Sequence, residues 1–173
     1  MTTFFTADQH FSHANIIKYC NRPFCDVAEM NKELIANWNS CVQPNDEVFV
    51  LGDFVFGGSF ESIVFRLNGQ IGLILGDHDR PAREIDRKVF ILGKLYEFKA
   101  GSVSITLCHY ALRTWPKSHY NSWSLYGHSH GRLVPEGKSL DVGVDVNSRF
   151  VPYSLAEIEK IMEGRPDNFN LVR

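Results

Sequence analysis

Five short segments of this sequence place carboxylate and imidazole side chains directly after apolar stretches. They are Asp8-Gln9-His10, Gly52-Asp53, Gly76-Asp77-His78-Asp79, His109 and Gly127-His128-Ser129-His130. Carboxylates and imidazoles together are typical ligands of Mn, Fe, Zn, Ni and Co, and imidazole also transfers protons near neutral pH. A single Gly-Asp pair is usually an ordinary turn. Five segments with the same arrangement favour a shared metal site over five unrelated turns.

The apolar stretches before these segments predict the strands that position them. We expect strands at residues 3–7, 47–51, 71–75, 102–108 and 124–126. Loops at the carboxyl ends of strands gather along one edge of a sheet, where ligands bind. In an extended segment, residues two apart face the same side, so Asp8 with His10, and His128 with His130, are expected to face one cavity.

The remaining elements are predicted from periodicity and capping residues. Asp26 with Glu29, and Ser154 with Glu157, form capping pairs before helices expected at 27–40 and 155–163. A third helix is expected at 60–68, further strands at 89–93, 95–99 and within 139–146, and an aromatic-rich loop at 110–123. The order of these elements predicts an α/β fold with sheets covered by helices, in one domain over residues 1–173.

Composition and charge exclude several classes of protein. The chain has 173 residues, 44% of them hydrophobic, and a formal net charge of −2, which argues against disorder and against bulk binding of nucleic acid. It has neither an apolar run long enough to span a membrane nor a basic signal-peptide start. Because Cys20, Cys25, Cys41 and Cys108 have no CxxC spacing, we expect free thiols and a cytoplasmic protein.

The candidate ligand set is too large for a single metal ion. One tetrahedral zinc takes four ligands, whereas the five segments offer more than that. Two divalent ions about 3.5–4 Å apart, sharing a bridging carboxylate, fit the set better.

The motifs resemble those of the calcineurin-like metallophosphoesterase superfamily. All five blocks occur in that family's order over residues 8–130, and the string at 15–24 is similar to small bacterial and phage members. The resemblance implies a four-layer α/β/β/α sandwich that hydrolyses phosphate esters, as a phosphodiesterase or a phosphatase. It also implies two divalent ions, first of all manganese, with Fe, Zn, Ni or Co as alternatives. The implied partner is a small phosphate ester or nucleotide, with no membrane partner.

The resemblance also implies a role for each motif residue. One ion would be held by Asp8, His10, Asp53 and His130, and the other by Asp53, Asp77, His109 and His128. Asp53 would bridge the ions, and a hydroxide shared by them would be the nucleophile. His78 would stabilise or protonate the leaving oxygen, with Asp79 orienting its ring.

Asp77 departs from the pattern of this superfamily, which has Asn in Gly-Asn-His-Asp. With two divalent ions, the carboxylates of Asp8, Asp53 and Asp77 leave a charge of +4 − 3 = +1, one unit less than with Asn. An ionised Asp also lacks the N–H donor of Asn. We therefore expect weaker binding of an anionic substrate. A catalytically silent metal-binding scaffold of the same fold remains the alternative, and Asp77 is its main support.

Three further candidates for substrate contact carry weaker signals. His13 would contact the substrate phosphate or cap the following helix, and Arg22 would meet an anion or lie in a surface turn with Pro23. The loop after His109 offers either a wall for stacking bases or a packed loop, through Tyr110, Arg113, Trp115, Tyr120 and Trp123.

Overall fold

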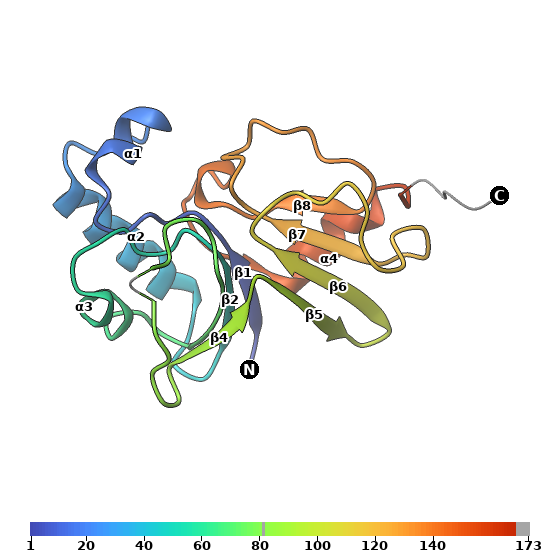
Figure 1. Cartoon of the computed structure of the whole chain (residues 1–173), viewed down its shortest axis with the longest axis horizontal. Helices are drawn as coiled ribbons and strands as arrows, with labels where there is room; N and C mark the ends of the chain where they lie inside the picture. The colour runs from blue at the N-terminus through green and yellow to red at the C-terminus, as the bar shows by residue number, and fades with distance from the viewer. Residues whose placement is uncertain (81, 169–173) are drawn as a thin grey trace.

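Two β-sheets with helices against them make up the computed structural model, which describes residues 1–80 and 82–168 (Figure 1). Residues 81 and 169–173 of the predicted domain lie outside this description. The strands are β1 (Thr3–Thr6), β2 (Glu47–Leu51), β3 (Gln70–Ile74), β4 (Val89–Gly93), β5 (Leu95–Ala100), β6 (Val103–Cys108), β7 (Trp123–Tyr126), β8 (Ser139–Asp141) and β9 (Tyr153–Ser154). The helices are α1 (Ala14–Tyr19), α2 (Val27–Cys41), α3 (Phe60–Val64), α4 (Leu155–Glu163) and the 3₁₀ helix η1 (Val144–Val146).

The strand directions bring the predicted strand ends together. The first sheet has the order β4-β3-β2-β1-β9, in which β1 to β4 are parallel and β9 is antiparallel to β1. The second has the order β5-β6-β7-β8, in which β6, β7 and β8 are parallel and β5 is antiparallel to β6. The carboxyl ends of parallel strands lie at one edge of a sheet, and these edges carry the chemical motifs.

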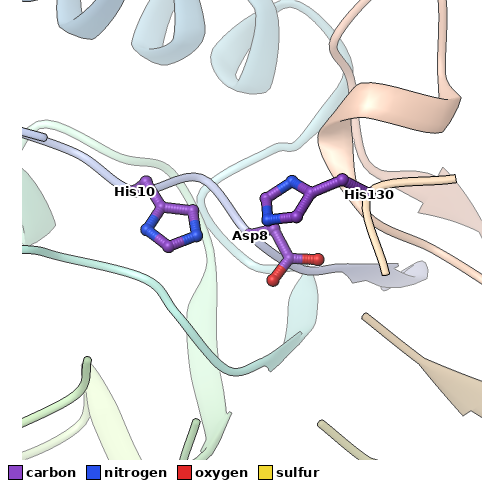
Figure 2. Close-up of side chains that lie close together, drawn as sticks. All are labelled: Asp8, His10 and His130. Carbon is purple, nitrogen blue, oxygen red and sulfur yellow. The ribbon is translucent and has the colours of Figure 1, made fainter. Parts of the chain in front are cut away.

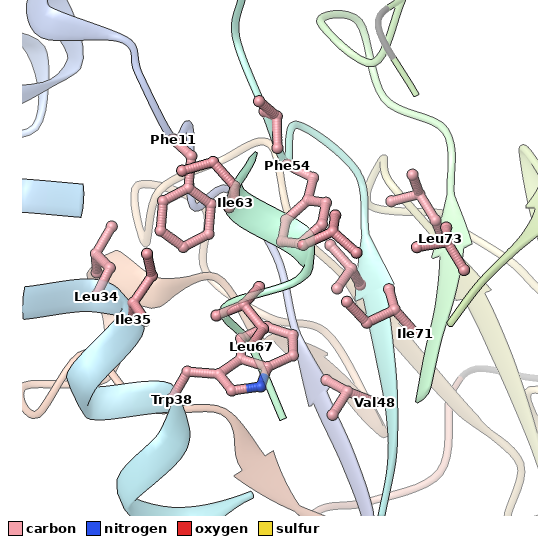
Figure 3. Close-up of a cluster of buried hydrophobic side chains, with 14 of the residues drawn as sticks. Phe11, Leu34, Ile35, Trp38, Val48, Phe54, Ile63, Leu67, Ile71 and Leu73 are labelled. Carbon is pink, nitrogen blue, oxygen red and sulfur yellow. The ribbon is translucent and has the colours of Figure 1, made fainter. Parts of the chain in front are cut away.

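Alternate residues of the first sheet enter two separate hydrophobic clusters. Phe4 and Val48 belong to the cluster formed with α2 and α3, which Figure 3 shows. Phe5 and Phe49, one position further along each strand, pack instead against the second sheet, with their rings stacked at 5.4 Å. The first sheet is therefore buried on both faces, which explains the continuous apolar runs of its strands.

The long helices follow their sequence signals. α2 begins after Asp26, whose side chain accepts the N–H of Glu29, and it buries Trp38 against the first sheet. α4 begins with the full capping box of Ser154 and Glu157. α4 buries its apolar residues in the cluster between the sheets rather than in a cluster of its own. The mixed α/β fold with two sheets is confirmed, and the four-layer arrangement stays a prediction.

One predicted helix is shorter than expected, and two short elements had no predicted bounds. The helix expected at 60–68 ends at Val64, and residues up to Leu67 continue in single turns. α1 was anticipated only through the capping alternative for His13, and the two-residue strand β9 was not expected. His13 is the N-cap residue of α1 but makes no side-chain capping bond, so α1 lacks the usual start signal.

The thiol prediction agrees with the structure, in which all four cysteines are free. No helix within residues 1–80 and 82–168 is both long and apolar enough to cross a membrane.

Candidate metal centre

The predicted ligands converge in two groups of three at the strand ends. Asp8, His10 and His130 form one group, in which one ligand atom per residue lies within 4.8 Å of the others. Figure 2 shows Asp8 and His10 on the segment after β1 and His130 beside them. The second group, by the same distance, is Asp53 with His109 and His128. The grouping follows the division that the resemblance implied, except that Asp77 falls in neither group and Asp53 falls in the second group alone.

Asp53 lies between the two groups. Its Oδ2 atom is 3.5 Å from Nε2 of His10 and 3.6 Å from Nε2 of His109. A second link joins the groups directly, because the backbone N–H of His128 donates to Oδ2 of Asp8 at 2.8 Å. A carboxylate in the position of Asp53 can contact two ions at once.

The backbone at five of these residues is left-handed. The φ angles are 60° at Asp8, 51° at His10, 54° at Asp53, 65° at His128 and 47° at His130. The pairs Asp8 with His10 and His128 with His130 do face the same site, as expected. The expected reason, an extended backbone in which residues two apart face one side, is wrong. Left-handed conformations at non-glycine residues cost about 1–3 kcal/mol each and cluster at functional sites. This strain is independent support for a functional role of these loops.

Two motif glycines permit the close approach of the loops. Gly52 has a φ of +87°, and a Cβ atom there would lie 2.5 Å from Nδ1 of His109. A Cβ atom on Gly127 would lie 2.6 Å from Oδ2 of Asp8. Any side chain at these positions would push the ligands apart. This steric restriction explains why glycine precedes Asp53 and His128 in the two motifs.

Hydrogen bonds fix the orientation of two ligand imidazoles. Nδ1 of His109 is 2.8 Å from the carbonyl oxygen of Leu51, so that Nε2 is directed at Asp53. Nδ1 of His130 is 2.7 Å from Oδ2 of Asp145. Metal-binding histidines commonly donate one ring N–H to a carbonyl or carboxylate in this way. The sequence did not single out Asp145, because one or two strands were expected within 139–146, whereas Asp145 lies in the 3₁₀ helix η1.

Arg22 is part of the scaffold and not a substrate contact, which corrects the prediction. It is 4% exposed. Its Nε and Nη2 atoms donate to the two carboxylate oxygens of Asp145, each at 2.8 Å. Nη1 and Nη2 also donate to the carbonyl oxygens of Gln9 and Asp8. The guanidinium therefore links the segment after β1 to Asp145, and Asp145 in turn contacts His130.

We expect Asp145→Asn to weaken divalent metal binding by about 10–100-fold, because it removes the carboxylate that orients His130. Titration calorimetry with Mn²⁺ on the metal-stripped protein measures this change. Asp86→Asn, the same substitution at an exposed residue, is the matched control. Equal Mn²⁺ affinity of Asp145→Asn and the control would show that Asp145 does not position His130.

Two buried ligand atoms have no hydrogen-bond partner within the described part of the chain. They are Oδ1 of Asp8 and Nε2 of His10. Burial raises the pKa of Asp8 well above its usual value and lowers the pKa of His10 to about 2, so the His10 imidazole is neutral. A buried carboxylate oxygen and an imidazole lone pair without partners are costly, and a bound cation would satisfy both. The residues present therefore fit a divalent metal ion.

His130 carries a proton that a metal ion would displace. Burial lowers its pKa, but the hydrogen bonds to Asp145 and Cys20 and the charge of Asp8 outweigh burial and raise the pKa to about 10. Metal ions compete with protons for imidazole nitrogens. The same carboxylates that attract this proton would attract a cation.

His78 lies in the wall of the site as an exposed ring. Its backbone N–H donates to Oδ1 of Asp53 at 3.0 Å, and its ring centroid is 5.5 Å from that of His10. The predicted role of Asp79 needs correction. The Asp79 carboxylate accepts the backbone N–H groups of Asp53, Phe54 and Gly76 at 2.7–2.9 Å. It therefore holds the loop that carries Asp53 instead of the ring of His78.

Asp77 is exposed and is held by a neighbouring tyrosine. The hydroxyl of Tyr110 donates to Oδ1 of Asp77, and Oδ2 lies 3.8 Å from Nδ1 of His128. The hydrogen bond lowers the pKa of Asp77 and raises the pKa of Tyr110 to about 12. Asp77 is thus an ionised carboxylate beside the second ligand group.

The ligand groups open into a cleft of about 640 Å³. His13 lines this cleft, with its ring stacked on Phe56 at 3.9 Å and its Nδ1 atom 3.4 Å from Nδ1 of His10. It does not cap α1, so the capping alternative is wrong. The alternative of a stacking wall in the 110–123 loop is also wrong for Trp115 and Trp123, which are 6% and 5% exposed and packed in the interior.

Comparison with known proteins places this chain beside others of similar length. No family model matches the chain. The chain superposes on the protein of unknown function AQ665 from Aquifex aeolicus with a TM-score of 0.67, at 19% identity over 92% of this chain and 98% of that one. The likeness to Yfce, a phosphoesterase from E. coli, has a TM-score of only 0.45 at 20% identity, over 83% and 79% of the two chains.

Sequence relatives are found in an archaeon and in a phage. The Gene 66 protein of Mycobacterium phage L5 is 25% identical over 86% of this chain and 89% of its own length. The uncharacterized protein MJ1445 of Methanocaldococcus jannaschii is 34% identical in an alignment of 168 positions, which covers 91% of this chain and 89% of that protein. This chain therefore belongs to the same protein family as MJ1445.

Proposed function

We propose that this protein is a hydrolase of small phosphate esters that uses two divalent metal ions. The observation that carries the proposal is the pair of adjoining ligand groups with Asp53 between them, at the base of an open cleft. Asp8, His10 and His130 would hold one ion, and His109 and His128 the other, with Asp53 shared. Manganese is the first candidate, because mixed carboxylate and imidazole ligands suit it, as they suit Fe, Zn, Ni and Co.

The positive charge that such chemistry needs would come from the metal ions. Two divalent ions would neutralise the anionic phosphate and lower the pKa of water, so that hydroxide is available near neutral pH. The chain itself keeps the ligands rigid. Asp79 holds the Asp53 loop by three backbone hydrogen bonds, and Arg22 with Asp145 holds the segments of Asp8 and His130.

His78 is the candidate proton donor to the leaving oxygen. It is exposed in the same cleft, and its backbone is tied to Asp53 by a hydrogen bond. An imidazole has a pKa suited to donating a proton near neutral pH. It belongs to neither ligand group, so its ring remains available to a substrate.

Hydrolysis by the metal-stripped protein after addition of Mn²⁺, Ni²⁺, Zn²⁺ or Mg²⁺ tests the proposal. The substrates are bis(p-nitrophenyl) phosphate, p-nitrophenyl phosphate, cyclic nucleotides and dinucleotides. We expect hydrolysis that depends on added metal and is abolished by EDTA. Metal binding without hydrolysis of any of these esters would favour the silent scaffold.

Asp77→Asn is expected to raise kcat/KM about tenfold when metal is saturating. The substitution adds one unit of positive charge and can provide an N–H donor to phosphate. Such a donor is typically worth a hundredfold or more in a dry site, and less in an open cleft. The measurement is kcat/KM of both forms across a Mn²⁺ titration, with Asp86→Asn as the control. Equal or lower activity of the Asn form at saturating metal would show that the Asp77 carboxylate is a working ligand.

A further inference from the structure

The cleft extends beyond the space that the ligand groups enclose. Its volume of about 640 Å³ lies in the range of about 300–1,000 Å³ typical of small-molecule sites. Away from the ligand groups, it is lined by Tyr19 at the end of α1, by Phe56 after β2 and by Arg132. We call these three residues the outer wall. A phosphate group alone would leave the outer wall without a contact.

The outer wall exposes aromatic rings where neighbouring aromatic residues are buried. Tyr19 is 62% and Phe56 is 39% exposed, whereas Phe11 and Phe54, close in sequence, are fully buried. Solitary exposed apolar side chains are common on protein surfaces. Two exposed rings in the same cleft as a cluster of charged ligands are less common. They combine apolar area with convergent polar groups, which is typical of small-molecule sites.

The rings of the outer wall are continuous with the residues proposed for catalysis. Phe56 stacks on His13 with ring centroids 3.9 Å apart and planes at 18°. It also forms a T-shaped pair with His78, with ring centroids 5.1 Å apart. The ring centroids of Tyr19 and His13 are 6.3 Å apart, and the two rings are nearly perpendicular. The aromatic surface thus begins beside His10 and His78 and continues outward to Tyr19.

Arg132 keeps the outer wall in a fixed place. Its Nη2 atom donates to the carbonyl oxygen of Tyr19 at 2.7 Å, which ties the end of α1 to the loop that follows His130. This bond joins residues 113 positions apart in the sequence. A wall held against the ligand loop is pre-organised, which reduces the entropy lost when a ligand binds.

We infer that the substrate is a phosphate ester that carries a flat aromatic ring, of the kind a nucleoside provides. The phosphate faces the two ligand groups, and the ring lies against Tyr19 and Phe56. Stacking of a base on aromatic side chains tolerates different bases, because every base has a π-face. The inference rests on the proposed function for the place of the phosphate, and it names the substrate class of that same cleft.

Binding of two phosphates that differ only in the aromatic part tests the inference without turnover. The probes are thymidine 5′-monophosphate and methyl phosphate, titrated into the Mn²⁺-loaded full chain by calorimetry. We expect the nucleotide to bind about tenfold more tightly, at the low end of what base stacking provides. Tyr19→Ala and Phe56→Leu are each expected to remove most of this preference while methyl phosphate binds as before.

Phe65→Leu is the matched control, because Phe65 is 67% exposed and does not line the cleft. Equal affinity of the wild type for the two phosphates would overturn the inference, as would an equal loss of preference in Phe65→Leu. Circular dichroism of each variant shows whether it is folded. Tyr19→Phe keeps the ring and should retain the preference for the nucleotide, and it replaces Tyr19→Ala as the test if that variant is misfolded.

Hydrolysis of thymidine 5′-(p-nitrophenyl phosphate) separates this inference from the proposed function. Cleavage of the ester without a binding preference for the nucleotide would overturn the inference and leave the proposed function intact. A clear binding preference without cleavage of any ester would overturn the proposed function and support an aromatic phosphate as the ligand of the cleft.

Discussion

Replacing Asp53 with Asn is expected to lower kcat/KM about a thousandfold. Asp53 lies within 3.6 Å of imidazole nitrogens from both ligand groups and is 4% exposed. The neutral amide would weaken the binding of both ions together. Loss of metal assistance removes several kcal/mol of transition-state stabilisation, and about 4 kcal/mol corresponds to a thousandfold in rate.

The measurement for Asp53→Asn is the steady-state rate beside metal content, determined by elemental analysis of the same sample. Asp26→Asn is the matched control, because Asp26 is an exposed helix cap and Asn caps equally well. We expect the Asp53 variant to bind fewer metal ions than the control. Two tightly bound ions in Asp53→Asn would contradict the position of Asp53 between the ions.

His78→Ala is expected to lower kcat about a hundredfold to ten-thousandfold while metal content stays at the wild-type level. A positioned general acid typically contributes an effect of this size. His78 belongs to neither ligand group, and its hydrogen bond to Asp53 comes from the backbone N–H. Its ring should therefore matter to chemistry more than to metal binding.

Metal stoichiometry and kcat of His78→Ala are compared with those of His119→Ala. His119 lies outside all five motif segments, and its ring is tilted against that of Tyr120. The role of a proton donor also predicts that esters with good leaving groups, such as p-nitrophenolate, lose less activity than alkyl esters. If His78→Ala loses a metal ion, His78 is a ligand, and the assignment of its role is wrong.

The parts of the fold that the sequence predicts are those with strong local signals. α2 and α4 have side chains that cap them and apolar residues at helical spacing, and β2 is a run of buried residues. α1 has neither a capping side chain nor a long amphipathic face, and so the local sequence does not reveal it. β9 has two residues, too few for a pattern.

The errors at the site come from interactions between residues that are distant in the sequence. Arg22 before Pro23 has the pattern of a surface turn, but its partner Asp145 is 123 residues away. Asp79 follows His78 directly, yet its carboxylate binds backbone groups 25 and 26 residues earlier. Local sequence indicates which residues are available for chemistry, whereas tertiary contacts decide which of them face the cleft.

Asp145 illustrates a signal that a closer interpretation of the sequence would have found. β8 ends at Asp141, and Gly143 precedes the 3₁₀ helix η1, which contains Asp145. An acidic residue shortly after a strand and a glycine repeats the arrangement of Asp53. The expectation of one or two strands within 139–146 concealed this similarity.

Anomalous diffraction from crystals soaked in Mn²⁺ shows whether two divalent ions bind side by side at the strand ends. We expect two anomalous peaks about 3.5–4 Å apart. One would contact Asp8, His10 and His130, the other His109 and His128, and Asp53 would contact both. A single peak, or peaks away from these side chains, would contradict the account.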